Sequence, residues 1–458
     1  MYDYIIMSKF IQADIRVIDN QTRLTKEQKE AVGLLSIGTF LEYFDLMLYV
    51  HMAVLLNELF FPKADPFSAS LQSAFAFCSV FVLRPVGAFV FGQIGDKIGR
   101  KIIVVITTFL MSLSCIIIAT LPTYEQIGIA AAWLVTLCRM LQGISSMGEI
   151  VGAEIYLTEF VRPPMQYPAV MLIAIFSILG GTTALGIAFV ATKYEFNWRI
   201  AFWIGACIAM VGGVARTALK ETTDFADAKR RLKNTLDKLN VNIITLKDDP
   251  ILYEKVKTQT AIALFLIQCG WPICFYFTYI YCGNLLKSQF GYKPEEVINH
   301  NFIVSMVNLF GYISLMYLSY KIHPLKILKA KVLIFLPVAL LCPYLLNNIA
   351  NPWHLFLLQS FFMLFVLSTN PATPIFYTHI PIFKRFTYGG FIYAISRALM
   401  HITTSFGIIY CEKYLGQWGL SLIILPMTIG YGVGVLYFVK LEKEAGNYYN
   451  TGYQLASV

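Results

Sequence analysis

Two carboxylates within the first long apolar segment are the first residues whose spacing points to chemistry. Glu42 and Asp45 are three residues apart and Tyr49 follows four residues later, so a helix places all three on one face. Carboxylates this close repel each other, which favours a proton on one of them. The pair is therefore suited to binding and releasing a coupling proton, and its alternative role is a structural ion pair with an arginine.

A second polar stripe lies in the fourth apolar segment. Arg139, Gln142, Ser146 and Glu149 follow one helix face, and Glu154 and Glu159 continue it along the segment. Ionisable side chains inside a membrane span face the bundle interior or a water-filled cavity. We therefore expect Arg139, Gln142 and Tyr49 to bind a substrate, and Glu149 to be a further proton-coupling candidate. The alternative for Arg139 is a pair with a carboxylate that only clamps helices together.

The eleventh apolar segment carries Tyr393, Arg397, His401 and Thr404 on one face. The forked guanidinium of Arg397 matches a carboxylate in geometry, so Arg397 and Tyr393 are candidates for substrate binding. Arg397 could equally neutralise Glu42 or Asp45. For His401, the role of an interior histidine competes with that of a proton relay.

Aromatic and sulfur-containing residues give a weaker signal. Four aromatic residues of the seventh segment could enclose a quaternary ammonium group, or could simply line the bundle or face lipid; they are Trp271, Phe275, Tyr276 and Tyr279. The nine cysteines are odd in number and irregularly spaced, without a CxxC pair, so neither a disulfide framework nor a metal site is expected.

The elements that position these residues follow from composition. The 458-residue chain is 57% hydrophobic and 14% charged, with a mean hydropathy of +0.63. Soluble domains contain about 25% charged residues, so an all-α polytopic membrane protein is expected. In such a protein the net charge of +9 fits basic loops beside anionic lipid, and no nucleic-acid partner is expected.

Twelve apolar runs, each long enough to cross a bilayer, are separated by polar segments. They lie at about 32–57, 67–91, 102–121, 126–156, 168–192, 199–219, 258–284, 300–320, 331–350, 353–378, 387–410 and 418–439. The sequence thus predicts an N-terminal segment (1–31), a six-helix half (32–219), a linker (220–257), a second six-helix half (258–440) and a tail (441–458).

The distribution of basic residues predicts the orientation. With both termini in the cytoplasm, cytoplasmic segments contain 27 Lys and Arg residues, outer segments contain six, and three lie inside spans. This bias places both termini in the cytoplasm by the positive-inside rule.

A glycine-rich charged turn between the second and third runs is the most specific motif. Its conspicuous residues are Gly92, Gly95, Asp96, Gly99, Arg100 and Lys101. In this position the pattern resembles the loop between helices 2 and 3 of major facilitator superfamily transporters. The resemblance implies the major facilitator fold, and a gating role for these residues on the cytoplasmic face. The equivalent segment of the second half, Tyr317–Pro324, lacks the charges.

Further motifs are similar to those of one group in that superfamily, the metabolite:proton symporters of the proline/betaine transporter type. They are Gly38–Asp45, Arg84–Ala88, Arg139–Gly143 with Gly148–Glu149 and Gly152–Ala153, Asn197–Ile200 and Glu221–Thr222. Thr39, Met147 and Arg397 depart from the pattern of the group, and the resemblance is weaker after residue 258.

The resemblance implies a secondary active transporter in a bacterial inner membrane, working as a monomer. It would import a zwitterion such as proline or glycine betaine by proton symport and alternating access, with the proton as coupling ion and no other cofactor. The alternatives are a di- or tricarboxylate carrier, favoured by Arg397, and a nontransporting receptor derived from a carrier. An enzyme is not expected, because the six histidines are scattered and neither HExxH nor GxSxG occurs.

Overall fold

The computed structural model describes residues 21–62, 66–98, 100–146, 150–194, 197–217 and 255–448. Six helical passes form the N-terminal half of this described part. They are α2 (Lys26–Phe60), α3 (Pro66–Val82) with α4 (Arg84–Ile98), α5 (Arg100–Thr120), α7 (Ile129–Ser145) with α8 (Ile150–Phe160), α9 (Gln166–Lys193) and α10 (Arg199–Thr217); the short α6 (Tyr124–Ile127) precedes α7.

Six further passes form the C-terminal half. The first is built from α13 (Thr258–Gln268), α14 (Gly270–Phe275), the π-helix η2 (Tyr276–Tyr281) and α15 (Cys282–Phe290). The others are α16 (Pro294–Lys321), α17 (Pro324–Asn347), α18 (Pro352–Leu364) with α19 (Thr373–Thr378), α20 (Ile382–Leu415) and, after the 3-10 turn η3 (Gly416–Leu420), α21 (Ser421–Glu444).

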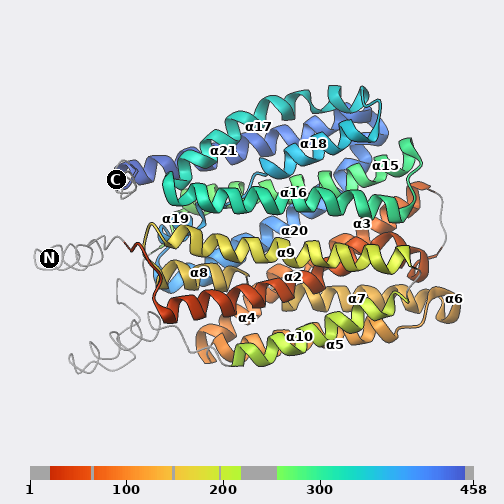
Figure 1. Ribbon diagram of the computed structural model, residues 1–458, viewed down its shortest axis with the longest axis horizontal. Coiled ribbons are helices and arrows are strands. Elements are labelled where there is room, and N and C mark those ends of the chain that lie inside the picture. Colours follow the sequence, from red (N-terminus) through yellow and green to blue (C-terminus); the bar gives the residue numbers. More distant parts are fainter. Residues whose placement is uncertain are drawn as a thin grey trace, which may run out of the picture.

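The two halves lie side by side with their helices along the long axis of the molecule (Figure 1). They meet where α9 packs along α16, and where α20 packs against α3 and α4. The start of α2 and the end of α21 lie at the same end of the bundle, on the left in Figure 1, which we call the terminal end. There the Gln28 side chain donates a 2.8 Å hydrogen bond to the Phe160 carbonyl, and His379 contacts Glu442 at 2.7 Å.

Local sequence signals account for many helix boundaries. Thr25 and Gln28 form a capping box at the start of α2, satisfying backbone N–H groups that have no partner within the helix. Proline opens α16, α17 and α18, where its missing N–H costs nothing. Helices α2, α16, α17 and α18 therefore begin one to seven residues before the apolar runs that predict them.

Glycines allow two helix pairs to touch through their backbones. A Cβ atom at Gly143 of α7 would lie 1.8 Å from the carbonyl oxygen of Val80 in α3. One at Gly180 of α9 would lie 2.3 Å from the carbonyl oxygen of Phe40 in α2. Small residues at such contacts drive packing between helices in lipid, where no hydrophobic effect pulls them together.

Length and composition alone identify six segments of the described chain as able to cross a membrane. They are Lys26–Met52, Ile129–Phe160, Gln166–Ala191, Thr258–Phe290, Pro294–Lys321 and the double segment Lys384–Glu444. Lys331, at the start of the ninth predicted run, lies inside α17 and is only 4% exposed. The predicted orientation stays a prediction. Most of the predicted linker lies outside the described residues, so the predicted domain boundaries stay predictions.

Candidate functional site

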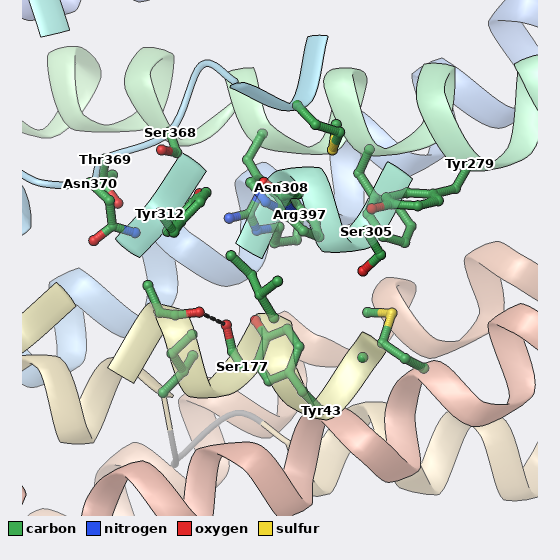
Figure 2. A pocket seen from close by; sticks show the side chains of 18 of the residues that line it. Tyr43, Ser177, Tyr279, Ser305, Asn308, Tyr312, Ser368, Thr369, Asn370 and Arg397 are labelled. Carbon is green, nitrogen blue, oxygen red and sulfur yellow. Dashed lines mark hydrogen bonds between the residues drawn. The ribbon is translucent and has the colours of Figure 1, made fainter. Parts of the chain in front are cut away.

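A small cavity, partly open to solvent, lies between the two halves of the bundle (Figure 2). Side chains from α2, α8 and α9 form its wall on the N-terminal side. On the C-terminal side it is lined by α13, α14, η2, α16, α18, α20 and the segment 368–370 between α18 and α19. Both polar and aromatic groups reach the cavity, among them Tyr43, Ser177, Asn308 and Arg397.

Arg397 contributes a guanidinium group to the lining of this cavity. Its Cζ atom lies 4.5 Å from the centroid of the Trp271 ring and 4.8 Å from that of Tyr393, and Nη1 is 3.5 Å from the Gln268 carbonyl oxygen. Among the described residues no carboxylate lies within ion-pair distance of Arg397, and its Nε has no hydrogen-bond partner. Stacking on two rings holds the guanidinium in place while leaving donors for a ligand.

Two tyrosines join the halves across the cavity. The hydroxyl groups of Tyr43 in α2 and Tyr393 in α20 lie 3.1 Å apart, and both residues line the cavity. Nearby, the rings of His51 and Tyr279 meet edge-on with centroids 6.0 Å apart. The structure therefore brings two of the predicted substrate-binding residues, Tyr393 and Arg397, together in the cavity.

The cavity face of α2 is not the face that the sequence singled out. Tyr43, Met47 and His51 line the cavity, at four-residue intervals. Glu42 and Asp45 are not among the lining residues and are 4% and 1% exposed. The carboxylate of Asp45 points toward α10, because a Cβ at Gly205 would lie 2.5 Å from its Oδ1. The acidic pair lies inside the N-terminal half, and its proton-coupling role stays a prediction.

Arg139, Gln142 and Tyr49 form a buried cluster among α2, α5 and α7. Arg139 Nη1 donates to Gln142 Oε1 at 3.0 Å, and the Arg139 Cζ atom lies 4.2 Å from the centroid of the Tyr49 ring. Gln142 in turn contacts the Cys115 sulfur at 3.4 Å. None of the three lines the cavity, so this conformation does not bring them to a bound solute. Their substrate-binding role stays a prediction.

Other predicted residues lie beyond what the structure describes. Glu149 falls in the undescribed segment 147–149. Backbone of the predicted gating loop is described where α4 ends at Ile98 and α5 begins at Arg100. Gly99 and the side chains of Asp96, Arg100 and Lys101 lie outside the described part, as do the surroundings of Gly92 and Gly95. Their gating role and the coupling role of Glu149 are therefore untested.

The aromatic group of the seventh pass divides between the cavity and the helix contacts. Trp271, Phe275 and Tyr279 line the cavity, whereas Tyr276 packs on Phe77 of α3 with ring centroids 5.6 Å apart. His401 is fully buried against Phe81, with centroids 3.7 Å apart, and its ring nitrogens have no hydrogen-bond partner among the described residues. His401 lies outside the set of lining residues.

Glu154 is a cavity residue that the sequence argument placed on the polar stripe but did not select as a site residue. It projects from α8 into the lining, and its Oε2 accepts a 3.1 Å hydrogen bond from the hydroxyl of Tyr377 in α19. Glu154 is only 5% exposed. Its position in a membrane span was a sufficient signal, because an ionisable side chain there is by default a functional candidate.

Further contacts join α8 to α20 near the terminal end. Arg385 Nη1 in α20 donates to Glu159 Oε1 in α8 at 2.9 Å, and both side chains are nearly buried. A second contact joins the same two helices, since a Cβ atom at Gly152 of α8 would lie 3.4 Å from the Phe386 ring of α20. We call the ion pair and this contact the terminal gate.

Removing the ion pair should loosen the terminal gate. We expect Arg385→Gln to raise the labelling rate of an introduced Ser177→Cys in the cavity roughly two- to tenfold, since the pair is worth about 0.5–1.5 kcal/mol. A membrane-impermeant maleimide added at the terminal end of oriented proteoliposomes measures this rate. The adjacent Lys384→Gln is the matched control, and an equal rate in both variants would remove Arg385 from the gate.

Comparison with known proteins agrees with this architecture. The model of the Major Facilitator Superfamily matches residues 35–408. The xylose transporter XylE from E. coli, in a partially occluded inward-open conformation, superposes with a TM-score of 0.69 at 13% identity, covering 91% of this chain and 98% of that one. The described part of the chain is helical, and it superposes on a solved transporter over most of its length, so the predicted all-α major facilitator fold is confirmed.

Two curated relatives share sequence with part of the chain. The proline/betaine transporter of Escherichia coli is 34% identical over 220 residues, which is 46% of this chain and 43% of the relative. The citrate-proton symporter of Salmonella typhi is 34% identical over 209 residues, 44% of this chain and 48% of the relative. The chain thus matches less than half the length of either relative. Both are named as transporters, in agreement with the prediction that the protein is not an enzyme. With its family model, twelve passes and central cavity, the chain is a membrane protein of the Major Facilitator Superfamily.

Proposed function

We propose that the protein is a secondary active transporter that imports a small organic solute bearing a carboxylate, by proton symport with alternating access. The observation that carries this proposal is the Arg397 guanidinium, which faces a cavity between two halves and has no described carboxylate partner. A cation held in a partly enclosed site is suited to bind a carboxylate through paired hydrogen bonds.

Buried carboxylates support the coupling to protons. Glu42 and Asp45 lie within the N-terminal half, next to the cavity-facing side of α2. A carboxyl group in such surroundings can take up a proton on one side of the membrane and release it on the other when the halves move. The 27-to-six bias of basic residues supports an orientation with both termini in the cytoplasm. The similarity to the proline/betaine transporter of Escherichia coli supports a bacterial inner-membrane location.

Two substrate classes fit a carboxylate site. A proline- or betaine-like zwitterion is supported by the motifs in the first half and by the similarity to the proline/betaine transporter. A di- or tricarboxylate is supported by the similarity to the citrate-proton symporter and by Arg397 itself. Uptake of labelled solutes of both classes into proteoliposomes, with and without an imposed pH gradient, tests the function. Absence of gradient-driven uptake for every solute would contradict it and favour a receptor.

Arg397 provides a direct test of the carboxylate contact. Arg397→Lys keeps the charge but loses the planar fork, so binding should weaken by about 1–3 kcal/mol, or roughly five- to 150-fold in apparent affinity. The concentration dependence of uptake measures this change. An unchanged affinity would assign Arg397 to a structural counter-charge. Lys413→Arg, at the far end of α20, is the control for disturbance of that helix.

A further inference from the structure

The cavity presents opposite charges from its two walls. Among the described lining residues, Arg397 of α20 is the only guanidinium and Glu154 of α8 is the only carboxylate. One belongs to the C-terminal half and the other to the N-terminal half. A solute that carries both charges can bridge the halves, with its carboxylate on Arg397 and its cationic group on Glu154.

The aromatic surface near these charges is already occupied. Trp271 stacks against Phe275 with ring centroids 4.8 Å apart, and the guanidinium of Arg397 covers Trp271 at 4.5 Å. Tyr393 also lies against Arg397, at 4.8 Å. A methylated ammonium would therefore have to compete with the cation of the protein itself for the rings of Trp271 and Tyr393.

Hydrogen-bond acceptors, in contrast, are available to a solute. Tyr377 donates to Oε2 of Glu154, and a carboxylate can accept several further bonds. Ser177, whose hydroxyl donates to the Ala174 carbonyl at 2.7 Å, turns its oxygen toward the cavity as an acceptor (Figure 2). An ammonium with N–H bonds can use these acceptors, whereas a fully methylated one has no hydrogen to donate.

We propose that the cavity selects zwitterions whose cationic group retains N–H bonds, the class of α-amino and imino acids, over their N-methylated betaines. Arg397 binds the carboxylate, and Glu154 accepts hydrogen bonds from the ammonium. This proposal rests on the transport function proposed above and narrows its substrate class. Glu154 is in this view a specificity-determining residue, and its bond to Tyr377 keeps the carboxylate oriented toward the cavity.

The test compares ligands of nearly constant shape. L-proline, N-methyl-L-proline and N,N-dimethyl-L-proline are titrated against the purified wild-type protein, with thermal stabilisation as the binding signal and counterflow as the transport signal. We expect the apparent affinity to fall with each N–H bond lost, by about tenfold or more from proline to the dimethyl compound. Equal or tighter binding of the dimethyl compound would overturn the proposal, with no variant needed.

A variant then assigns the selectivity to Glu154. Glu154→Gln should weaken proline binding about tenfold or more, and should change the apparent affinity for the dimethyl compound by no more than about twofold. The differences in affinity among the three compounds should then become small. Glu412→Gln is the matched control, because Glu412 also accepts from a tyrosine hydroxyl, that of Tyr281 at 3.4 Å, but does not line the cavity. An equal loss for all three compounds in Glu154→Gln would mean a structural role and contradict the proposal.

Citrate and succinate serve to separate this proposal from the transport function. If the protein carries either of them with a pH gradient but none of the three proline compounds, the transport function stands and the zwitterion site is wrong. If no compound of either class is bound or carried, both proposals fail.

Discussion

Replacing Asp45 with asparagine is expected to abolish accumulation of the solute while leaving exchange across the membrane. An amide has the shape of the carboxyl group but cannot carry a proton, so the solute can no longer be driven by a pH gradient. With one proton per solute, a gradient of two pH units supports an accumulation of about 100-fold, since each unit is worth about 1.4 kcal/mol. In Asp45→Asn this ratio should fall to about one.

The measurement pairs gradient-driven uptake with counterflow in the same proteoliposomes, because exchange moves no net proton. Glu42→Gln is tested in parallel, and Glu412→Gln controls for loss of a half-buried carboxyl elsewhere. If both α2 variants still concentrate the solute, the coupling group lies outside this pair and Glu149 is the next candidate. Loss of folded protein instead of coupling would point to the structural role left open for the pair.

A methyl group at Gly143 is expected to cause a comparably large loss, in this case of the folded state. In Gly143→Ala the new Cβ would lie 1.8 Å from the Val80 carbonyl oxygen and 2.7 Å from its carbon, both backbone atoms that cannot turn away. Helices α3 and α7 must separate, at a cost of about 3 kcal/mol, the upper range for overpacking. The yield of monodisperse protein in detergent and its unfolding midpoint should both fall sharply.

Gly33→Ala in α2 is the control for this substitution. Nothing lies within 4 Å of a Cβ at Gly33, so alanine there should be neutral or stabilise the helix by about 0.5–1 kcal/mol. An unfolding midpoint for Gly143→Ala equal to that of Gly33→Ala would mean that the contact between α3 and α7 is looser than described.

The helical passes could be predicted because a membrane-spanning helix requires only a continuous run of apolar residues, which is visible in the local sequence. The run at 168–192, for example, becomes α9 at Gln166–Lys193. Interruptions within passes could not be predicted in this way. The segment between α18 and α19 interrupts an apolar run with the polar residues 368–370. Its backbone also finds a partner elsewhere, because the Tyr431 hydroxyl donates to the Ser368 carbonyl at 2.7 Å. Pro371 was the local hint of such a break.

The candidate site could be predicted only in part, for a related reason. Helical spacing shows that Glu42, Asp45 and Tyr49 share a face, but not which face meets the other half of the bundle. On α2 that face carries Tyr43, Met47 and His51 instead. On α20, by contrast, the polar stripe and the cavity face coincide at Tyr393 and Arg397. The difference depends on packing between distant segments, which a single sequence does not contain.

The unbroken length of α20 has a mechanical consequence. This one helix carries Arg385 at the terminal gate and Arg397 at the cavity, twelve residues and therefore about 18 Å apart along a stiff rod. On the opposing wall, Glu154 and Glu159 are likewise five residues apart on α8. A tilt of α20 or α8 that moves its cavity charge toward a solute must also move its charge at the terminal gate. Solute binding and gate closure are then coupled in one rigid-body movement, so the solute does not leak through between the two.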